Sequence, residues 1–357
     1  LSERRADLAV ANCRPSLLTK THTAPSQVSP TVANSPSPQR TFRTQPNMRD
    51  ASPQPLVIWR LMDGKPGHEN QTLGLIKALE RLATARGMAA PRSIDMPLGG
   101  YSYTLWDWLF KRFRPGFLQP RPDFIIGAGH RTHWPMLCAR RSFGGKAIAL
   151  MSPTLPCAFF DLVVAPAHDG LTGRNVMVTQ GVLNAMQPAP VKRPGYTVVL
   201  VGGVSKHFLW DAAQVLAQLD EIMVRHPQVR LTDSRRTPPA LRAELAKRWP
   251  VIYQPWEKCP TGWLASELAI AENAWVTEDS VSMIYEALTA GCAVGLVSLR
   301  RPEGKAGRLV RGIEALEQGG WIRRLPEPLS SLNLEHGLLN EADRVAASIL
   351  LSVESCI

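Results

Sequence analysis

The stretch A-W-V-T-E-D-S-V-S-M-I-Y-E-A-L-T-A-G-C-A-V-G-L-V, residues 274–297, predicts a strand, a helix and a second strand in succession. An apolar run ends at Thr277, and the helix that follows ends at Gly291, a residue type that commonly terminates helices. A second apolar run then covers residues 293–297. Strands connected through a helix normally pair in parallel, with helices covering the sheet. The stretch therefore predicts an α/β fold with a parallel sheet.

The same alternation extends through most of the chain. Further strands are predicted at residues 56–61, 123–126, 146–151, 162–165, 197–201, 229–232 and 251–254, with helices at 70–86 and 209–226. The proline-rich stretch Q-P-A-P-V-K-R-P-G, residues 187–195, interrupts this pattern and is typical of a linker. We therefore expect two Rossmann-like domains with parallel sheets, at 55–190 and 191–330, followed by a C-terminal helical segment at 331–357.

Residues 1–54 differ in composition from the remainder of the chain. They are rich in Ser, Thr, Pro and Gln and lack a sustained hydrophobic period, which is typical of a disordered tail. The sequence begins with Leu1, and Met48 stands just before the first predicted strand. We expect the native protein to start at Met48, with an organellar transit peptide as the alternative.

The net charge and the spacing of the cysteines indicate which partners and which cellular compartment to expect. The net charge is +11, of which residues 1–50 contribute +4 through seven Lys/Arg and three Asp/Glu. The surplus favours anionic partners such as nucleotides or an acidic membrane surface, and without a recognised motif we expect no nucleic acid. Six cysteines without a C-x-x-C pair indicate reduced thiols in the cytoplasm, not a zinc site or a disulfide framework. The sequence has no apolar run of transmembrane length.

The loop D-G-K-P-G-H-E-N-Q, residues 63–71, joins the first predicted strand to a helix. Loops at the carboxyl ends of parallel strands carry ligand sites in such sheets. Glycines at 64 and 67 allow close backbone approach, and His68 is a candidate general base. The other predicted ligand contacts on this acceptor-side loop are Asp63, Lys65, Gly67, Asn70 and Gln71. The alternative is a tight turn in which Asp63 or Asn70 caps the helix.

A second loop, G-A-G-H-R-T-H-W-P at residues 127–135, follows another strand in the first half of the chain. Two glycines again precede polar side chains. Its predicted ligand contacts are Gly129, Arg131 and Thr132. The alternative is a glycine-lined packing contact with histidines on the surface.

Two loops of the second half are candidates for phosphate binding. V-G-G-V-S-K-H, residues 201–207, contributes Gly202, Gly203, Ser205 and Lys206 at the expected opening of a helix, where free amides favour anions. The spacing does not match a Walker A motif. S-R-R-T-P, residues 234–238, contributes Arg235, with a solvated basic turn as the alternative.

The loop and helix at 277–287 carry the most informative cluster. We expect Glu278 and Asp279 in the loop as ligand contacts. Ser280 and Ser282 are expected at the start of the helix, where their hydroxyls cap it or bind a phosphate. Acidic residues at that position also complement the helix dipole. Glu286 lies beyond the first turn, so the dipole does not explain it; a carboxylate there suits the two hydroxyls of a ribose.

Residues 101–114, Y-S-Y-T-L-W-D-W-L-F-K-R-F-R, combine aromatic residues with a basic end. We expect a buried helix. A helix at the surface of an anionic membrane is the alternative.

Six motifs in this order resemble the mitochondrial fission ELM-type family: D-G-K-P-G-H-E-N-Q, G-A-G-H-R-T-H, L-M-S-P-T-L-P, G-G-V-S-K-H, S-R-R-T-P and V-T-E-D-S-V-S-M. The resemblance runs from about residue 57 to 299. The family comprises the plant elongated-mitochondria protein and many bacterial relatives, sometimes labelled nucleoside-diphosphate-sugar epimerases.

The plan is also similar, more distantly, to the N-acetylglucosaminyltransferase that makes the lipid-linked peptidoglycan precursor. That similarity implies a glycosyltransferase-B arrangement, in which the first domain faces an acceptor and the second holds a sugar nucleotide. It implies that His68 deprotonates the acceptor and that Glu286 binds the ribose. It also implies that a final helix, near residues 335–352, packs back on the first domain. Only one glycine precedes His68 here, because Pro66 replaces its neighbour.

These observations predict a sugar-nucleotide-binding protein of glycosyltransferase-B type, acting as a metal-independent glycosyltransferase. No D-x-D motif for a metal-bound diphosphate is present, so we expect neither a metal nor another cofactor. The alternatives are a nucleoside-diphosphate-sugar epimerase in the same cleft and a non-catalytic scaffold that recruits a protein partner.

Overall fold

The computed structural model describes residues 54–302, 307–332 and 337–354. The predicted N-terminal tail, apart from its last residue, and the predicted start at Met48 lie outside the described residues.

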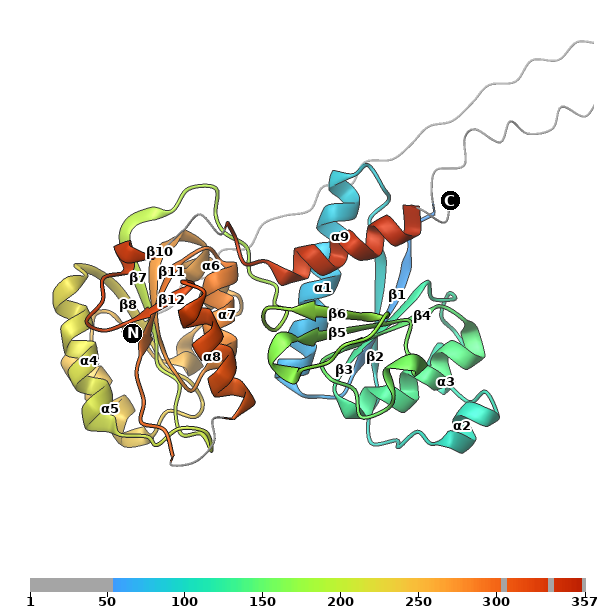
Figure 1. Ribbon diagram of the computed structural model, residues 1–357, viewed down its shortest axis with the longest axis horizontal. Coiled ribbons are helices and arrows are strands. Elements are labelled where there is room, and N and C mark those ends of the chain that lie inside the picture. The colour runs from blue at the N-terminus through green and yellow to red at the C-terminus, as the bar shows by residue number, and fades with distance from the viewer. Residues whose placement is uncertain (1–53, 303–306, 333–336, 355–357) are drawn as a thin grey trace, which may run out of the picture. The chain divides into compact units, whose positions relative to one another are not determined.

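The first half of the chain forms a six-stranded parallel sheet in the order β2-β1-β3-β4-β5-β6 (Figure 1). Its strands are β1 (Val57–Met62), β2 (Arg92–Pro97), β3 (Phe124–Ala128), β4 (Lys146–Leu150), β5 (Leu162–Pro166) and β6 (Val176–Thr179). Its helices are α1 (Pro66–Ala85), α2 (Leu105–Leu109) and α3 (His133–Phe143). Every residue of β3 is buried, as expected for a central strand covered on both faces.

The second half forms another six-stranded parallel sheet, in the order β12-β11-β10-β7-β8-β9. Its strands are β7 (Arg193–Leu200), β8 (Gln228–Thr232), β9 (Tyr253–Gln254), β10 (Ala271–Thr277), β11 (Ala293–Val297) and β12 (Ile322–Arg324). Its helices are α4 (Ala212–Arg225), α5 (Pro239–Arg248), α6 (Trp263–Ile270), α7 (Val281–Thr289) and α8 (Arg308–Gln318). Two Rossmann-like α/β halves are therefore confirmed, while the exact domain boundaries stay a prediction.

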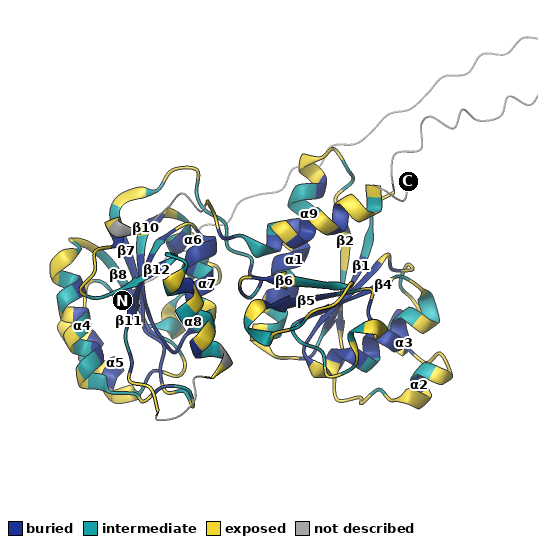
Figure 2. Cartoon of the chain, in the orientation of Figure 1, coloured by how far each residue is buried: buried dark blue, intermediate teal, exposed yellow. Residues whose placement is uncertain are grey.

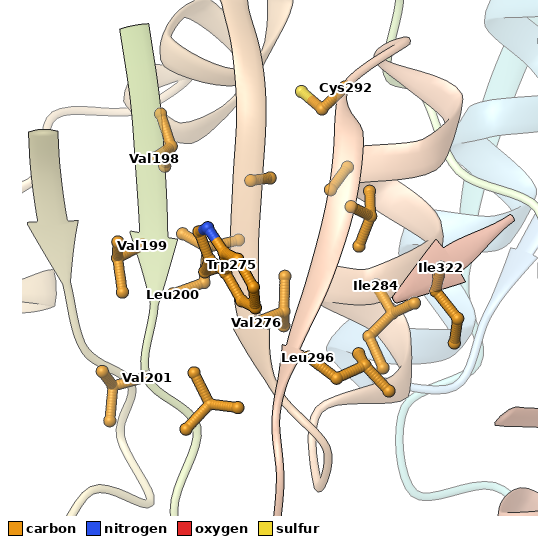
Figure 3. Close-up of a cluster of buried hydrophobic side chains, with 14 of the residues drawn as sticks. Val198, Val199, Leu200, Val201, Trp275, Val276, Ile284, Cys292, Leu296 and Ile322 are labelled. Atoms are coloured by element: carbon orange, nitrogen blue, oxygen red, sulfur yellow. The ribbon is translucent and has the colours of Figure 1, made fainter. Parts of the chain in front are cut away.

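The core of the second half is organised around Trp275, which is 1% exposed (Figure 3). Its partner in the neighbouring strand is Gly295. A Cβ atom at Gly295 would lie 2.4 Å from Trp275 Cε3, so the glycine leaves the space that the indole fills. Most of the remaining buried apolar positions of β7, β10 and β11 are Val and Leu.

The last helix, α9 (Glu341–Glu354), packs against α1 of the first half (Figure 1). Val345, Ala346 and Ile349 are buried in the same hydrophobic cluster as α1. Arg81 of α1 forms a salt bridge with Asp343 of α9. The predicted return of the final helix to the first half is therefore confirmed, although the helix begins at Glu341 and not near residue 335.

Three strands escaped the sequence analysis. β2 reads R-S-I-D-M-P and lies at the sheet edge, where four of its six residues are exposed, so no apolar run marks it. β6 and β12 are edge strands of only four and three residues. The buried strands were predicted because burial on both faces requires continuous apolar sequence; Figure 2 shows them in dark blue.

Both sheets have a topological switch point, a place where successive strands depart to opposite sides. In the first sheet it lies between β1 and β3, and in the second between β7 and β10. The loops that leave such neighbouring strands diverge and expose a crevice at the carboxyl edge, where ligands bind in doubly wound folds. The predicted polar clusters all lie in loops at these edges. No helix in the part of the chain that the structure describes is long and apolar enough to cross a bilayer.

Candidate functional site

His68 and Asp63 form a hydrogen-bonded pair at the switch point of the first sheet. Asp63 follows β1 directly and its side chain is fully buried, while the His68 side chain, in the first turn of α1, is 19% exposed. His68 Nδ1 lies 2.8 Å from Asp63 Oδ2, and the other carboxylate oxygen accepts from the Lys65 amide at 3.1 Å. The carboxylate thus fixes the ring orientation and leaves Nε2 without a protein partner among the described residues, the arrangement expected of a general base.

Gly129 of the second predicted loop lies against His68 of the first. It follows β3 with φ of +81°, a conformation that favours glycine. A Cβ atom there would lie 2.3 Å from His68 Cε1, so the imidazole packs directly on this glycine. The structure therefore brings His68, Asp63 and Gly129 together at one point, although 61 residues separate the two loops' key positions in sequence.

The other predicted acceptor-side residues fall into two groups, one exposed to solvent and one buried. Those open to solvent are Lys65, Gly67, Asn70 and Arg131, the last of which donates to the Gly99 carbonyl. Thr132 and Gln71 are buried, and their side chains bond to the carbonyls of Gly129 and Gly67. Each of these two side chains donates to the protein's own backbone, and the ligand contacts of Thr132 and Gln71 stay a prediction. The alternative, in which Asp63 or Asn70 caps α1, is wrong too: the N-cap residue is Lys65, without a side-chain bond.

In the glycine loop after β7, backbone amides donate to other side chains of the protein. The Gly202 amide donates to Thr277 Oγ1 at 2.6 Å, and the Gly203 amide donates to Asp279 Oδ2 at 3.0 Å. The loop does not open a helix as we predicted: α4 begins at Ala212 and is capped by the Asp211 side chain. Gly202 and Gly203 therefore offer no free amide to a phosphate. Ser205 and Lys206, farther along the loop, remain at least partly exposed.

Asp279 links three loops of the second sheet. Its side chain is fully buried, accepts from the Gly203 amide, and lies 2.7 Å from the Arg236 guanidinium. Burial raises the pKa of Asp279, and the Gly203 amide and Arg236 counteract only part of that effect. Protein groups thus bind Asp279 Oδ2, and the ligand contact of Asp279 stays a prediction. Arg236 was not among the predicted ligand contacts. Both Arg235 and Arg236 are exposed, but Arg236 pairs with Asp279.

Glu278 is the centre of a buried charge cluster. It is 1% exposed; Oε1 accepts from Arg324 at 2.6 Å and from Arg301 at 3.0 Å, and Oε2 accepts from the Leu299 amide at 3.1 Å. Burial alone would raise its pKa, but the bonds and charge of Arg324, with Leu299 and Arg301, hold the pKa of Glu278 below its ordinary value. Both oxygens of Glu278 therefore have protein partners, which supports a structural role, and its ligand contact stays a prediction.

The N-terminus of α7 is open, unlike that of α4. Ser280 is the N-cap residue, but its hydroxyl makes no capping bond to the helix. Within the described residues, no acceptor lies on the amides of Val281, Ser282 and Met283. The prediction that serine side chains cap this helix is wrong: Ser280 makes no capping bond, and Ser282 lies exposed on the first turn. Three amides, the helix dipole and the exposed hydroxyl of Ser282 are thus available to an anion here, whereas Ser280 is buried.

Glu286 lies on the same helix and has no partner. Its side chain is half-buried, and among the described residues nothing donates a hydrogen bond to it or pairs with it. Burial alone raises the pKa of Glu286 from 4.5 to about 7. A carboxyl group that is desolvated and unpaired in this way is unfavourable for the empty protein, which is typical of a ligand-binding residue. Glu278 has protein partners and Glu286 has none among the described residues, so the two carboxylates differ in their availability to a ligand.

The shifted pKa of Glu286 predicts a pH-dependent effect of Glu286→Gln. Because the folded-state pKa is raised, the fold holds the proton more tightly than the unfolded chain does, so stability falls as pH rises from 4.5 through about 7. The variant removes this loss. We expect it to match the wild type near pH 4.5 and to be more stable by up to about 3 kcal/mol near pH 8.

Urea unfolding of both proteins at the two pH values measures this difference. The matched control is Glu80→Gln on α1, which should change stability little at either pH. Equal stability of wild type and Glu286→Gln at the higher pH would contradict a desolvated carboxyl group.

A small pocket of 220 Å³ lies at the carboxyl ends of β8 and β9. Met283 of α7 lines it together with Ser234, Arg235, Trp256 and Trp263. Trp256 was not among the predicted ligand contacts, although it follows a strand that was predicted at residues 251–254. No cluster of three or more His, Cys, Asp or Glu side chains suited to a metal ion occurs among the residues that the structure describes.

The two doubly wound parallel sheets, with polar clusters at their switch points, define a protein of the glycosyltransferase-B fold class. A solved protein from Listeria monocytogenes, assigned as a UDP-N-acetylglucosamine 2-epimerase, is similar with a TM-score of 0.52 and 12% identity, over 85% of this chain and 96% of its own. Another UDP-N-acetylglucosamine 2-epimerase gives a TM-score of 0.51 and 13% identity, over 85% and 97%. At 12–13% sequence identity, these similarities show a shared fold and no more.

The family model of mitochondrial fission ELM1 matches residues 66–352, and the chain belongs to that family. A search of the curated proteins finds no match.

Proposed function

We propose that the second half of the chain binds a nucleoside-diphosphate sugar and that the protein is a metal-independent glycosyltransferase of the cytoplasm. The observation that carries this proposal is Glu286, a half-buried carboxyl group without a partner on a helix whose first turn is open. A ribose supplies two hydroxyl donors, which would replace the water that burial has removed from the carboxylate.

The open N-terminus of α7 supports the position of the diphosphate. Free amides at 281–283 point along the helix axis, where the dipole favours negative charge. The hydroxyls of Ser280 and Ser282 are at the same turn, and Ser205, Lys206 and Arg235 lie on neighbouring loops with at least partial exposure. These groups would bind the phosphates without a metal ion.

The 220 Å³ pocket supports a place for the base. Met283 lines that pocket and lies three residues before Glu286, a spacing that puts both on one side of α7. Two tryptophans offer apolar walls, while Ser234 and Arg235 offer polar groups to a base edge. One helix would thereby contact the base, the ribose and the diphosphate.

The pair of His68 and Asp63 supports the catalytic part of the proposal. In transfer, an acceptor oxygen bonds to the anomeric carbon of the sugar as the bond from that carbon to the diphosphate oxygen breaks. His68 Nε2 would take the acceptor proton, and Asp63 would stabilise the resulting imidazolium. The diphosphate would leave with negative charge, which the α7 amides would stabilise.

The test is a comparison of nucleotide binding by wild type and Glu286→Gln, measured by calorimetry with UDP and UDP-sugars. Gln keeps the shape but is a weaker acceptor, so affinity should fall about 10–100-fold, the equivalent of a hydrogen bond to a charged group. Calorimetry is preferred to thermal shift because the substitution itself changes the stability of the empty protein. Glu80→Gln is the control and should bind as the wild type does.

Three other outcomes of this experiment would distinguish the alternative functions. Equal binding by wild type and Glu286→Gln would remove the ribose assignment. Binding with interconversion of the sugar and no transfer would favour the epimerase. If the wild type binds no nucleotide, the scaffold becomes the better hypothesis, since a scaffold requires neither Glu286 nor His68.

A further inference from the structure

The segment around α2 exposes an apolar surface that the sequence predicted to be buried. We define the α2 patch as Leu105, Trp106, Leu109, Phe110 and Phe159, which are between 50% and 66% exposed. Trp106 and Phe110 stack on each other with ring centroids 6.1 Å apart. The prediction of a buried helix is therefore wrong: only Asp107 is buried and Trp108 half-buried, as the predominantly exposed colouring of α2 in Figure 2 indicates.

The outward orientation of the α2 patch is fixed by the way the helix is anchored. Asp107 faces inward, where it accepts hydrogen bonds from the Tyr101 hydroxyl at 2.8 Å and from the Thr104 amide and hydroxyl at 2.9 Å. These bonds hold one side of a helix that is only five residues long. The apolar side chains on its remaining sides consequently have no interior to enter.

The α2 patch continues into a cavity. A largely apolar pocket of 520 Å³ lies beside it, lined by Leu105, Trp108, Leu137 and Phe159, with Arg140 and Arg141 also in its wall. An apolar surface that leads into a cavity of this size accommodates a flexible hydrocarbon chain better than scattered exposed side chains would.

The charges around the α2 patch have one sign. Between residues 101 and 122 the basic residues are Lys111, Arg112, Arg114 and Arg121, and the single acidic residue, Asp107, is buried. Arg112 lies over the Phe110 ring and Arg141 over the Trp108 ring. No salt bridge joins Lys111, Arg112, Arg114 or Arg141 to a carboxylate within the described ranges. Arg140 of the pocket wall pairs with Asp161 at 3.0 Å. The apolar side chains are thus bordered mainly by cations that form no salt bridge within the described residues.

Lys111 occupies a backbone position that favours glycine. Its φ is +53°, and it lies where α2 ends in a Schellman motif, with the Arg112 amide bonded to the Asp107 carbonyl and the Lys111 amide bonded to the Trp108 carbonyl. A lysine in this left-handed conformation is less stable than a glycine would be. Its ammonium group is therefore an independent indication that charge matters at this place.

We propose that the α2 patch docks the protein on a membrane surface that contains anionic lipids. Aromatic side chains bordered by Lys and Arg match the interface of such a bilayer, where rings enter the headgroup region and cations bind phosphates. A protein partner or a second copy of the chain would need acidic groups opposite these cations, and residues 101–122 offer no exposed acidic group for self-pairing. This inference is independent of the sugar-nucleotide proposal.

Flotation with vesicles tests the docking. The full chain should bind vesicles of phosphatidylcholine and phosphatidylglycerol in equal parts, should not bind pure phosphatidylcholine, and should be released by high salt. Arg112→Ala with Arg114→Ala should lower partition about thirtyfold, the effect of two interfacial charges. Trp106→Ser with Phe110→Ser should reduce binding at least as much. Val224→Ser with Val251→Ser, and Lys77→Ala with Lys247→Ala, are exposed controls that should bind normally.

Lys111→Gly distinguishes docking from folding. Glycine suits the positive φ, so this variant should be at least as stable as the wild type, yet its partition should fall about fivefold through one lost charge. Unchanged partition of Lys111→Gly and of both patch variants would overturn the proposal, as would binding that ignores lipid charge. A wild type that dimerises in solution, and becomes monomeric in Trp106→Ser with Phe110→Ser, would assign the patch to a second copy instead.

Discussion

Replacing Glu278 with alanine is expected to lower the free energy of unfolding by about 2–3 kcal/mol, because it removes a buried carboxylate that accepts charged hydrogen bonds from Arg301 and Arg324. Glu278 is 1% exposed, and its Oε1 is shared by Arg301 and Arg324. Removal of the side chain would also strand the Leu299 amide, which donates to Oε2. Chemical denaturation near neutral pH measures the loss directly.

The matched control is Glu314→Ala. Glu314 also pairs with Arg301, but its side chain is 37% exposed, so its loss should change stability by less than about 1 kcal/mol. The pKa of Glu278 is held below its ordinary value, so its contribution is present above the unfolded-state pKa and disappears as pH falls through the folded-state pKa. The difference between wild type and Glu278→Ala should shrink in acid. A small, pH-independent difference would contradict the charge cluster, and lost nucleotide affinity in a stable variant would restore Glu278 to the ligand site.

Replacing His68 with alanine is expected to reduce turnover about 10²–10⁴-fold, the usual contribution of a general base. The measured reaction is release of UDP from the UDP-sugar that binds most tightly, with water as acceptor. Nucleotide affinity should change little, because His68 belongs to the first sheet and the proposed nucleotide contacts belong to the second. Gly129→Ala should have a similar effect, since its Cβ would lie 2.3 Å from His68 Cε1 and displace the ring.

His130→Ala is the control for His68. His130 is an exposed histidine on the loop that also contains Gly129, so it should retain wild-type turnover. Equal loss in His68→Ala and His130→Ala would point to a general disturbance of the loops. Full turnover in His68→Ala would exclude His68 as the base, and lost nucleotide affinity in that variant would give it a structural role.

The apolar strands and the position of the loops were predictable from the sequence. Continuous runs such as F-I-I-G-A, residues 124–128, indicate burial on both faces whatever the neighbours are. The loop containing His68 was predicted on the same grounds, because it follows a buried strand. Edge strands such as β2 were missed, since a strand that is half exposed carries polar residues that resemble a loop.

By itself the sequence determined that this chain builds two parallel sheets and that its polar clusters follow their strands, because local hydrophobic periodicity encodes both. Only the tertiary structure decided which polar residues remain available. Glu278 and Glu286 lie eight residues apart, and both were predicted as ligand contacts. Arg301 and Arg324, 23 and 46 residues beyond Glu278, fold onto it and satisfy its carboxylate. No described residue does so for Glu286. Whether a buried carboxyl group has a partner depends on contacts distant in sequence, which no local pattern records.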